Sequence, residues 1–501
     1  MNSLETRIHA PFERWLRSDP ERPFLFLPGK VLTFSALGKM VDLAEAELRD
    51  DGVLPGDRVL VVAENCPEHV ALLLACSRVG AWSCGVNARM APAEVAGFMA
   101  MADARVTYFT TEGSPPAEGH AQRHQAIASR VLGLQRTVVR QDALAEAEPL
   151  ASQVAAVIFT SGTTGAPKGV MLTHEGVLNF ARASAASRAL GPQDRSYAFV
   201  PMTHIFGLGT VLLASLQVGA ALEMRRQFDP VDLLDALENC GVSQLQGPPT
   251  LFSRLLAHLE ARGIQKPCAP ALRYLYTGAG PLDFALKLRV ESAFGLPLHH
   301  GYGLSEYAGS LHVTSLGQER SDTSAGYAIG GAEVRIVDEE GHTLPPGTRG
   351  EIWIRGRGLM PGYFRDPEST ATVMRKGGWY ATGDLGEMAD DGALFVVGRL
   401  KEMIVRSGFN VYPAEIEGVL NTFASIQRSA VVGKRESDGN EKVVAFVVLR
   451  PGRSLDELQL EEFLREHLAP YKRPGKIMVL ESLPLGGSGK VLKRELQALL
   501  G

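Results

Sequence analysis

Short apolar runs alternate with amphipathic segments through the first 300 residues, and this alternation predicts strands and helices in turn. Strands are expected at 58–63, 82–86, 106–109, 155–159, 196–200, 220–224, 243–246, 273–276 and 298–300. Helices are expected between them at 67–80, 92–102, 206–218, 230–240, 249–262 and 281–294. Alternation of this kind is typical of parallel sheets covered by helices on both faces. The pattern therefore predicts an α/β protein with two doubly wound sheets.

The pattern changes near residue 325. Short Val/Ile runs at 334–337, 351–355 and 394–397 alternate with Gly/Pro turns, which predicts a small antiparallel, β-barrel-like subdomain. After residue 399, strands near 429–432, 443–449 and 476–480 and a helix at 455–468 predict a compact α+β unit. A chain of 501 residues is too long for one core. We expect a large domain over residues 1–398 and a smaller, mobile domain over 399–501.

Composition narrows the class of protein. The chain is 45% hydrophobic and 21% charged, with a net charge of −5, which is ordinary for a globular protein and argues against a nucleic-acid binder. The five cysteines form no CxxC pair, so buried free thiols in a reducing cytoplasm are expected. No apolar run is long enough to span a membrane, and the N-terminus lacks the apolar core of a signal peptide.

A loop of small hydroxylic residues follows the strand expected at 155–159. It consists of Thr160, Ser161, Gly162, Thr163, Thr164 and Gly165, and Lys168 comes shortly after it. Hydroxyls, flexible backbone N–H groups and a lysine are what a loop needs to hold a polyphosphate. It is not a Walker A loop, because Gly169 stands where a Mg²⁺-binding Ser or Thr is required. A plain surface turn is the alternative interpretation.

Four further motifs follow in order: Gly301–Glu306, Tyr380–Asp384, Gly398–Glu417 and Gly489-Lys490. Together with the phosphate loop, in the same order and spacing, they resemble the adenylate-forming superfamily. That group contains acyl- and aryl-CoA synthetases, adenylation domains of nonribosomal peptide synthetases, and firefly luciferase. The resemblance covers nearly the whole chain, and five motifs in order are far more specific than any one of them.

The resemblance implies an acid–CoA ligase that uses ATP, Mg²⁺ and CoA. A carboxylate attacks the α-phosphate of ATP, which gives an acyl-adenylate and pyrophosphate, and the acyl group then passes to CoA. Lys490 would bridge the carboxylate and the α-phosphate, Glu306 would bind Mg²⁺, and Arg399 would support the ribose. The remaining AMP-binding residues would be Gly278, Ala279, Gly280, Gly301, Tyr302, Gly303, Ser305 and Asp384.

The resemblance also places the second half-reaction in the smaller domain. Lys401 occupies the hinge position, about which the domain would turn after adenylation. Gly408 and Phe409 would then line the tunnel for the pantetheine arm of CoA. A plain turn glycine is the alternative for Gly408.

The acid itself is only partly constrained. His204 stands where amino-acid adenylation domains carry an Asp for the substrate ammonium, so we expect a fatty or aryl acid without an α-amine. By resemblance, His204 helps the thioester step or gates the acyl pocket, with a structural histidine as the alternative. The pocket itself would be formed by His204, Arg254, Thr277, Gly303, Ala308 and Gly309, and the small residues Ala308 and Gly309 are expected to leave room for the acid. Arg254 could pair with a second carboxylate, as in malonyl-CoA synthetases, or lie on a helix surface. The sequence leaves open whether an acyl carrier protein replaces CoA, and whether the chain forms a homodimer.

Overall fold

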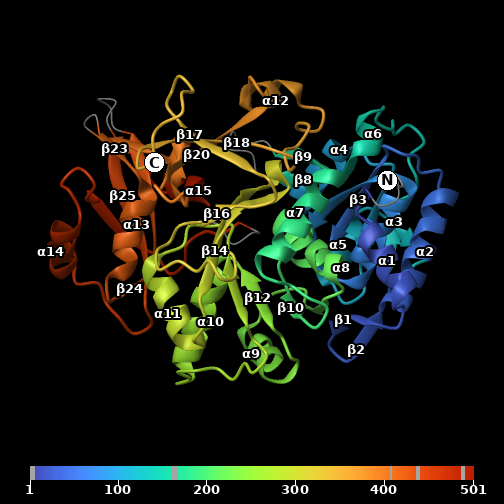
Figure 1. The fold of residues 1–501 in the computed structure, drawn as a ribbon, viewed down its shortest axis with the longest axis horizontal. Helices are drawn as coiled ribbons and strands as arrows, with labels where there is room; N and C mark the ends of the chain where they lie inside the picture. The colour runs from blue at the N-terminus through green and yellow to red at the C-terminus, as the bar shows by residue number, and fades with distance from the viewer. Residues whose placement is uncertain (1–5, 161–166, 407–408, 436–440, 487–490, 501) are drawn as a thin grey trace.

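A computed structural model describes residues 6–160, 167–406, 409–435, 441–486 and 491–500, and Figure 1 shows its arrangement. One sheet has the strand order β6-β7-β5-β3-β4-β8-β9. Its parallel centre consists of β3 (Arg58–Ala63), β4 (Trp82–Asn87), β5 (Val106–Thr110) and β8 (Val154–Thr160), with antiparallel β6 (Ile127–Ala128), β7 (Leu134–Arg136) and β9 (Lys168–Thr173) at the edges. The helices along this part of the chain are α3 (Pro67–Val79), α4 (Pro92–Ala102), α5 (Pro115–Arg123) and α6 (Leu150–Gln153). The predicted strands and helices of this unit are confirmed to within two residues.

The second sheet has the order β16-β15-β14-β13-β12-β10-β11-β1-β2. Parallel pairing joins β14 (Leu298–Leu304), β13 (Tyr274–Thr277), β12 (Gln244–Gly247), β10 (Arg195–Ala198), β11 (Ala221–Met224) and β1 (Pro23–Leu27). Antiparallel β15 (Gly309–Val313), β16 (Tyr327–Ala328) and β2 (Lys30–Thr33) complete it. Its helices are α9 (Pro230–Asn239), α10 (Pro249–Ala261) and α11 (Phe284–Phe294).

A layer of helices fills the space between the two sheets. The largest buried apolar cluster contains residues of both sheets together with residues of six helices: α1 (Ala10–Ser18), α2 (Phe34–Asp50), α3, α7 (His174–Ser187), η2 (Phe206–Leu213) and α8 (Ala214–Val218). The stretch 206–218, expected as one α-helix, begins as the π-helix η2 and becomes α-helical only at α8. The helix expected from 281 begins at Phe284, because the Asp283 carboxylate accepts the N–H of Leu286 as an N-cap.

A third sheet joins β17 (Glu333–Val337), β18 (Arg349–Arg355), β19 (Met374–Arg375), β20 (Trp379–Met388) and β21 (Leu394–Arg399), with α12 (Pro367–Val373) beside it. The C-terminal unit follows with η4 (Leu400–Glu402), β22 (Ile404–Arg406), β23 (Phe409–Val411), α13 (Pro413–Thr422), β24 (Ile426–Arg435), β25 (Glu441–Leu449), α14 (Glu457–His467), β26 (Lys476–Val479) and α15 (Lys493–Ala498). Figure 1 shows this unit, in orange and red, on the opposite side of the molecule from the N-terminal sheet. The predicted α/β class with a separate C-terminal unit is confirmed, while the boundary at 398–399 stays a prediction.

Within the described part of the chain, no helix combines the length and the apolar character needed to cross a bilayer.

Candidate active site

The predicted phosphate loop connects two antiparallel strands at the edge of the first sheet. Thr160 ends β8 and lies opposite Lys168, which begins β9. Ser161, Gly162, Thr163, Thr164 and Gly165 lie outside the described residues. The Nζ of Lys168 is 4.7 Å from the ring centroid of Tyr363, close enough for a cation–π contact. This contact holds the lysine beside the loop that it was expected to serve.

Tyr363 also reaches the carboxylate that was predicted to bind a metal. Glu306 lies in the short 3₁₀ turn η3 (Ser305–Tyr307) after β14, and its Oε1 accepts the hydroxyl of Tyr363 at 3.0 Å. The hydroxyls of Tyr363 and Tyr380 are 3.2 Å apart. Burial, and then the charge of Glu306, raises the pKa of Tyr363, so its hydroxyl stays protonated and keeps donating. One tyrosine thus links Lys168 to Glu306.

Asp384 is the centre of a second polar group. Its Oδ2 accepts the hydroxyl of Tyr302 at 2.7 Å, and its Oδ1 lies 2.9 Å from the Nε of Arg399. The Asp384 carboxylate raises the pKa of Arg399, while burial and then Asp384 raise that of Tyr302. Each carboxylate oxygen still has a free lone pair, so Asp384 can accept further hydrogen bonds from a ligand.

Residues without bulky side chains bring β13, β14 and β15 close together. A Cβ on Gly301 would lie 2.2 Å from the hydroxyl oxygen of Tyr276, and one on Gly303 would lie 2.3 Å from the carbonyl oxygen of Gly309. Ala279 has a left-handed backbone, with φ of 62°. Gly278 and Gly280 flank it, and Ser305 is buried at the start of η3. Gly301 and Gly303 therefore serve close packing, and contact of any of these residues with a nucleotide stays a prediction.

The expected acyl side carries both aromatic and polar groups. The Tyr276 hydroxyl lies 3.1 Å from the Ser310 Oγ, and the Phe206 ring meets the Tyr276 ring edge-on with centroids 5.9 Å apart. Thr277 is fully buried, and its Oγ1 has no hydrogen-bond partner among the described residues. The space beside Gly309, expected to be open, is filled: a Cβ there would lie 2.3 Å from the Phe180 ring. Ala308, with φ of 56°, is buried next to it.

His204 lies in the loop between β10 and η2. Its Nδ1 accepts the N–H of Phe206 at 3.2 Å. The loop is anchored by Asn65, a buried residue that sequence reasoning missed: its Oδ1 accepts the N–H of Met202 at 2.9 Å, and its Nδ2 donates to the carbonyl of Val200 at 2.9 Å. Asn65 follows β3, so it joins the ends of strands from both large sheets. Asn65 comes two residues after the end of β3, and no motif in the sequence marks its role.

The remaining predicted residues lie apart from these groups or cannot be placed. Arg254 is exposed on α10, with its guanidinium 4.7 Å from the Phe228 ring centroid. Lys401 is exposed in η4, and the backbone of Phe409 belongs to β23. Gly408 and Lys490 lie outside the described residues. The hinge, tunnel and lysine roles stay predictions.

The two polar groups lie between the same elements. Tyr302 and Glu306 belong to β14 and the turn after it, while Tyr380 and Asp384 belong to β20. Matches to family models agree with this arrangement: residues 12–364 match the AMP-binding enzyme family, and residues 415–490 match the AMP-binding enzyme C-terminal domain. The chain belongs to the AMP-binding enzymes. The resemblance inferred from the five motifs is thereby confirmed.

Curated relatives match across nearly the whole chain. A feruloyl-CoA synthase from Amycolatopsis sp. is 33% identical over 493 residues, which covers 97% of this chain and 98% of the relative. A 4-coumarate–CoA ligase 2 from Nicotiana tabacum is 32% identical over 478 residues, covering 91% and 87%. The expected enzyme class, an AMP-forming acid–CoA ligase, is confirmed.

A solved structure of ATP-bound MatB from Rhodopseudomonas palustris has the same fold. It superposes with a TM-score of 0.83 at 26% identity and covers 98% of this chain and 99% of its own. This likeness extends over the large domain and the C-terminal unit together.

Proposed function

We propose that this AMP-binding enzyme joins a ring-bearing carboxylic acid to CoA by way of an acyl-adenylate, and that its described polar groups bind ATP. The observation that carries the proposal is that two polar groups, one around Glu306 and one around Asp384, both connect β14 and the turn after it with β20. Lys168, Tyr363 and Glu306 offer a cation and a carboxylate next to the loop after β8. Tyr302, Asp384 and Arg399 offer a carboxylate that can accept both ribose hydroxyls.

In the first half-reaction, a carboxylate oxygen of the acid forms a bond to the α-phosphorus, and the bond to the pyrophosphate oxygen breaks. All the reacting groups are anions, so the residues act by holding them in place and balancing their charge. Lys168 and Arg399 supply positive charge from the described residues, and Lys490 would supply it at the α-phosphate. Asp384 fixes the ribose and so the distance between nucleotide and acid.

Glu306 fits a Mg²⁺ site. It is half-buried, and the donor recorded for its carboxylate among the described residues is the neutral Tyr363 hydroxyl, which leaves lone pairs for a cation. Mg²⁺ binds through one or two carboxylates and completes its shell with phosphate oxygens and water. When bound, the ion would neutralise charge on the phosphates. Tyr363 would hold the carboxylate in one orientation.

In the second half-reaction, the CoA sulfur attacks the acyl carbon, and AMP leaves with the pair of electrons of the broken bond. The C-terminal unit would turn about Lys401 between the two steps and bring the Gly408 tunnel to the site. A carrier protein is the alternative acceptor, and a homodimer stays a prediction. The three buried cysteines, Cys66, Cys76 and Cys84, support a reducing cytoplasm as the compartment.

An aryl acid is favoured over a fatty or dicarboxylic acid. The two relatives are named for ferulate and 4-coumarate. Phe206 and Tyr276 provide aromatic surfaces at the expected pocket, and the Tyr276–Ser310 pair could meet a ring hydroxyl. Arg254 is exposed and stacked on Phe228, which argues against its pairing with a second carboxylate.

A pyrophosphate-release screen tests the proposal. Ferulate, 4-coumarate, benzoate, octanoate, malonate and acetate would each be supplied with MgATP, with and without CoA, and products identified by mass. We expect AMP esters of the aryl acids, converted to thioesters only with CoA. If no acid yields an AMP ester, the proposed function is wrong; esters that CoA fails to consume would indicate a carrier protein as acceptor.

A further inference from the structure

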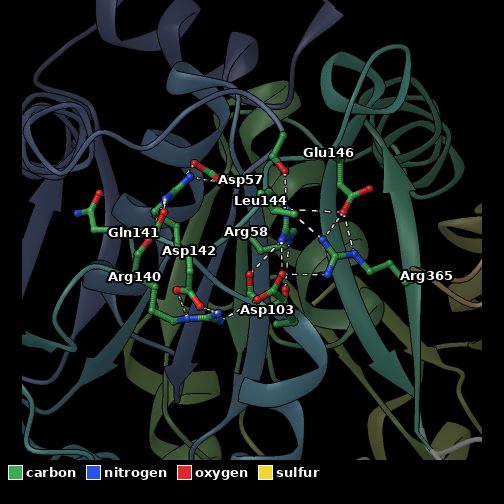
Figure 2. Close-up of polar contacts among 12 residues, drawn as sticks. Asp57, Arg58, Asp103, Arg140, Gln141, Asp142, Leu144, Glu146 and Arg365 are labelled. Carbon is green, nitrogen blue, oxygen red and sulfur yellow. Dashed lines mark hydrogen bonds and ion pairs between the residues drawn. The ribbon is translucent and has the colours of Figure 1, made fainter.

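A buried arginine organises two carboxylates at the amino end of β3, a central strand of the first sheet, and it stands outside the five motifs in sequence. Arg58, at the start of β3, is 0% exposed and donates to the backbone carbonyls of Gly56, Ala102, Asp103 and Leu144. Its guanidinium also lies 3.4 Å from the Asp103 carboxylate and 3.7 Å from that of Glu146. Figure 2 shows the two acids on either side of it. Arg58 thus fixes both carboxylates in one place.

Arg365 closes this arrangement from another part of the chain. Its Nε donates to Glu146 Oε1 at 2.9 Å, and its Nη1 donates to Asp103 Oδ2 at 2.9 Å, so one guanidinium spans both acids (Figure 2). Both arginines also lie over the ring of Phe364, with guanidinium carbons 5.4 Å (Arg58) and 5.0 Å (Arg365) from its centroid. We call Arg58, Asp103, Glu146 and Arg365 the carboxylate clamp.

The backbone conformation of Arg365 is one that the contacts of the carboxylate clamp help to hold. Arg365 has φ of 51°, a left-handed conformation that is strained for a non-glycine residue and persists where surrounding contacts enforce it. Forked arginine–carboxylate contacts supply such a constraint because their geometry is fixed in two directions. The side chain of Arg365 is 42% exposed, so its ion pairs add little to the stability of the fold. Their effect is to fix the orientation of the backbone at residue 365.

Arg365 lies two residues after Tyr363, in the same short segment, residues 363–365. Tyr363 forms a β-bridge with Val170 of β9, and the N–H of Phe364 donates to the carbonyl of Gly169 at 2.7 Å. Gly169 directly follows Lys168. The clamp therefore holds residues 363–365 along the strand that leaves the phosphate loop, with the Tyr363 side chain directed to both Lys168 and Glu306.

We propose that Arg365, through the carboxylate clamp, is a positioning residue for the MgATP subsite of this enzyme. It acts on Tyr363, which in turn orients Glu306 and Lys168, and it touches neither ATP nor acid. The inference rests on the proposed function for its assignment to ATP. Loss of Arg365 should release the segment, so that Tyr363 no longer orients the two charged groups together.

The test compares Arg365→Ala with Arg140→Ala. Arg140 is a matched control, because it donates to the other oxygen of the same Asp103 at 2.7 Å, whereas no direct contact with residues 363–365 is recorded for it in the described part of the chain. Titration with MgATP in a calorimeter is the primary measurement, and the KM values for MgATP and 4-coumarate are the second. We expect Arg365→Ala to weaken MgATP binding by about 10- to 100-fold, as for outer partners of metal ligands, with little change for the acid. Arg140→Ala should match the unmodified enzyme within about twofold.

A double-mutant cycle separates positioning from a general loss of structure. Tyr363→Phe should also weaken MgATP binding, because it removes the hydroxyl that holds Glu306. Arg365→Ala in the Tyr363→Phe background should add less than it does alone, because only the ring contact with Lys168 remains to be lost. Arg365→Lys keeps the positive charge but lacks the forked guanidinium, so it should weaken MgATP binding less than Arg365→Ala. It also replaces the alanine variant in the test if that variant fails to fold. Thioester formation from supplied 4-coumaroyl-AMP and CoA should be unchanged in Arg365→Ala, Arg365→Lys and Arg140→Ala.

The outcomes are distinct. Equal binding by Arg365→Ala and Arg140→Ala, additive losses with Tyr363→Phe, or an equal loss for ATP, acid and thioester formation would each overturn the positioning role. If the unmodified enzyme binds MgATP but esterifies no acid, the proposed function fails, and the titrations still decide the inference.

Discussion

Replacing Asp384 by Asn tests how the enzyme recognises the nucleotide sugar. The substitution keeps the size of the side chain but gives one carbonyl oxygen and one NH₂ group in place of two acceptors. Arg399 can only donate, so the carbonyl must face Arg399, and the NH₂ group must donate to the Tyr302 hydroxyl. The apo network can therefore survive with one hydrogen bond reversed. What is lost is the capacity to accept from both ribose hydroxyls.

The expected loss follows from that count. A hydrogen bond to a charged group contributes about 1.5–3 kcal/mol, and one such bond to the ribose is removed. Since each ~1.4 kcal/mol corresponds to a factor of ten, the Kd for ATP should rise roughly 10- to 150-fold. The effect on folding should be smaller, because Arg399 is 44% exposed and can turn to water when its partner loses charge.

The assay is calorimetric titration with MgATP and with AMP, supported by KM values and by thermal unfolding. Asp391→Asn is a matched control: Asp391 also accepts from an arginine, Arg320 at 2.6 Å, and a tyrosine, Tyr327 at 3.2 Å, but it lies in the turn between β20 and β21. AMP should lose as much affinity as ATP, since both carry the ribose. A lowered melting temperature with unchanged nucleotide affinity would refute the ribose assignment and leave Asp384 a structural residue.

Three further results are expected. Lys490→Ala should cut adenylation at least about a hundredfold and spare thioester formation from preformed adenylate, whereas Gly408→Leu should do the reverse; pyrophosphate and thioester assays separate them. Gly309→Ala should destabilise the fold by about 1–3 kcal/mol in urea unfolding, because φ is +134° and the Phe180 ring fills the space. Burial, then the charges of Arg78 and Arg7, lowers the pKa of His9 from 6.5 to about 4. The unfolded state therefore binds more protons between those pH values, so stability falls as the pH drops below 6.5, and His9→Gln should remove about 1 kcal/mol of that loss between about pH 7.5 and 5.5.

Elements with strong local periodicity could be predicted closely. The strand at 58–63 and the helix at 92–102 have the expected bounds, because turns bound each run and the alternation leaves few topologies. The hairpin of β1 and β2 was not predicted. Its pairing partner, β11, lies nearly 200 residues later, with Leu25 opposite Leu222, and nothing local in the sequence encodes that register.

The site residues also differ in whether the local sequence or the tertiary packing reveals them. Motif residues such as Glu306 and Asp384 could be named because each stands in a short, recognisable motif, Glu306 in the turn after β14 and Asp384 within β20. Tyr363 and Asn65 could not, since each acts through contacts made by tertiary packing, and neither stands in a motif that signals its role. Gly309 was expected to leave room for the acid, but the Phe180 ring fills the space beside it, and the sequence gives no sign of that contact.

The spacing of residues within two of the motifs places two contacts between β14, with the turn after it, and β20. Tyr302 and Glu306 stand four residues apart on β14 and its turn, and Tyr380 and Asp384 stand four residues apart on β20. Tyr302 bonds to Asp384 directly, while Glu306 reaches Tyr380 through the Tyr363 hydroxyl. Two connections between the same pair of elements fix both their separation and their relative angle. A shift of β20 would therefore move Asp384 and disturb the contacts of Glu306 together, so the residues proposed to bind the ribose and Mg²⁺ would lose their relative positions in one step.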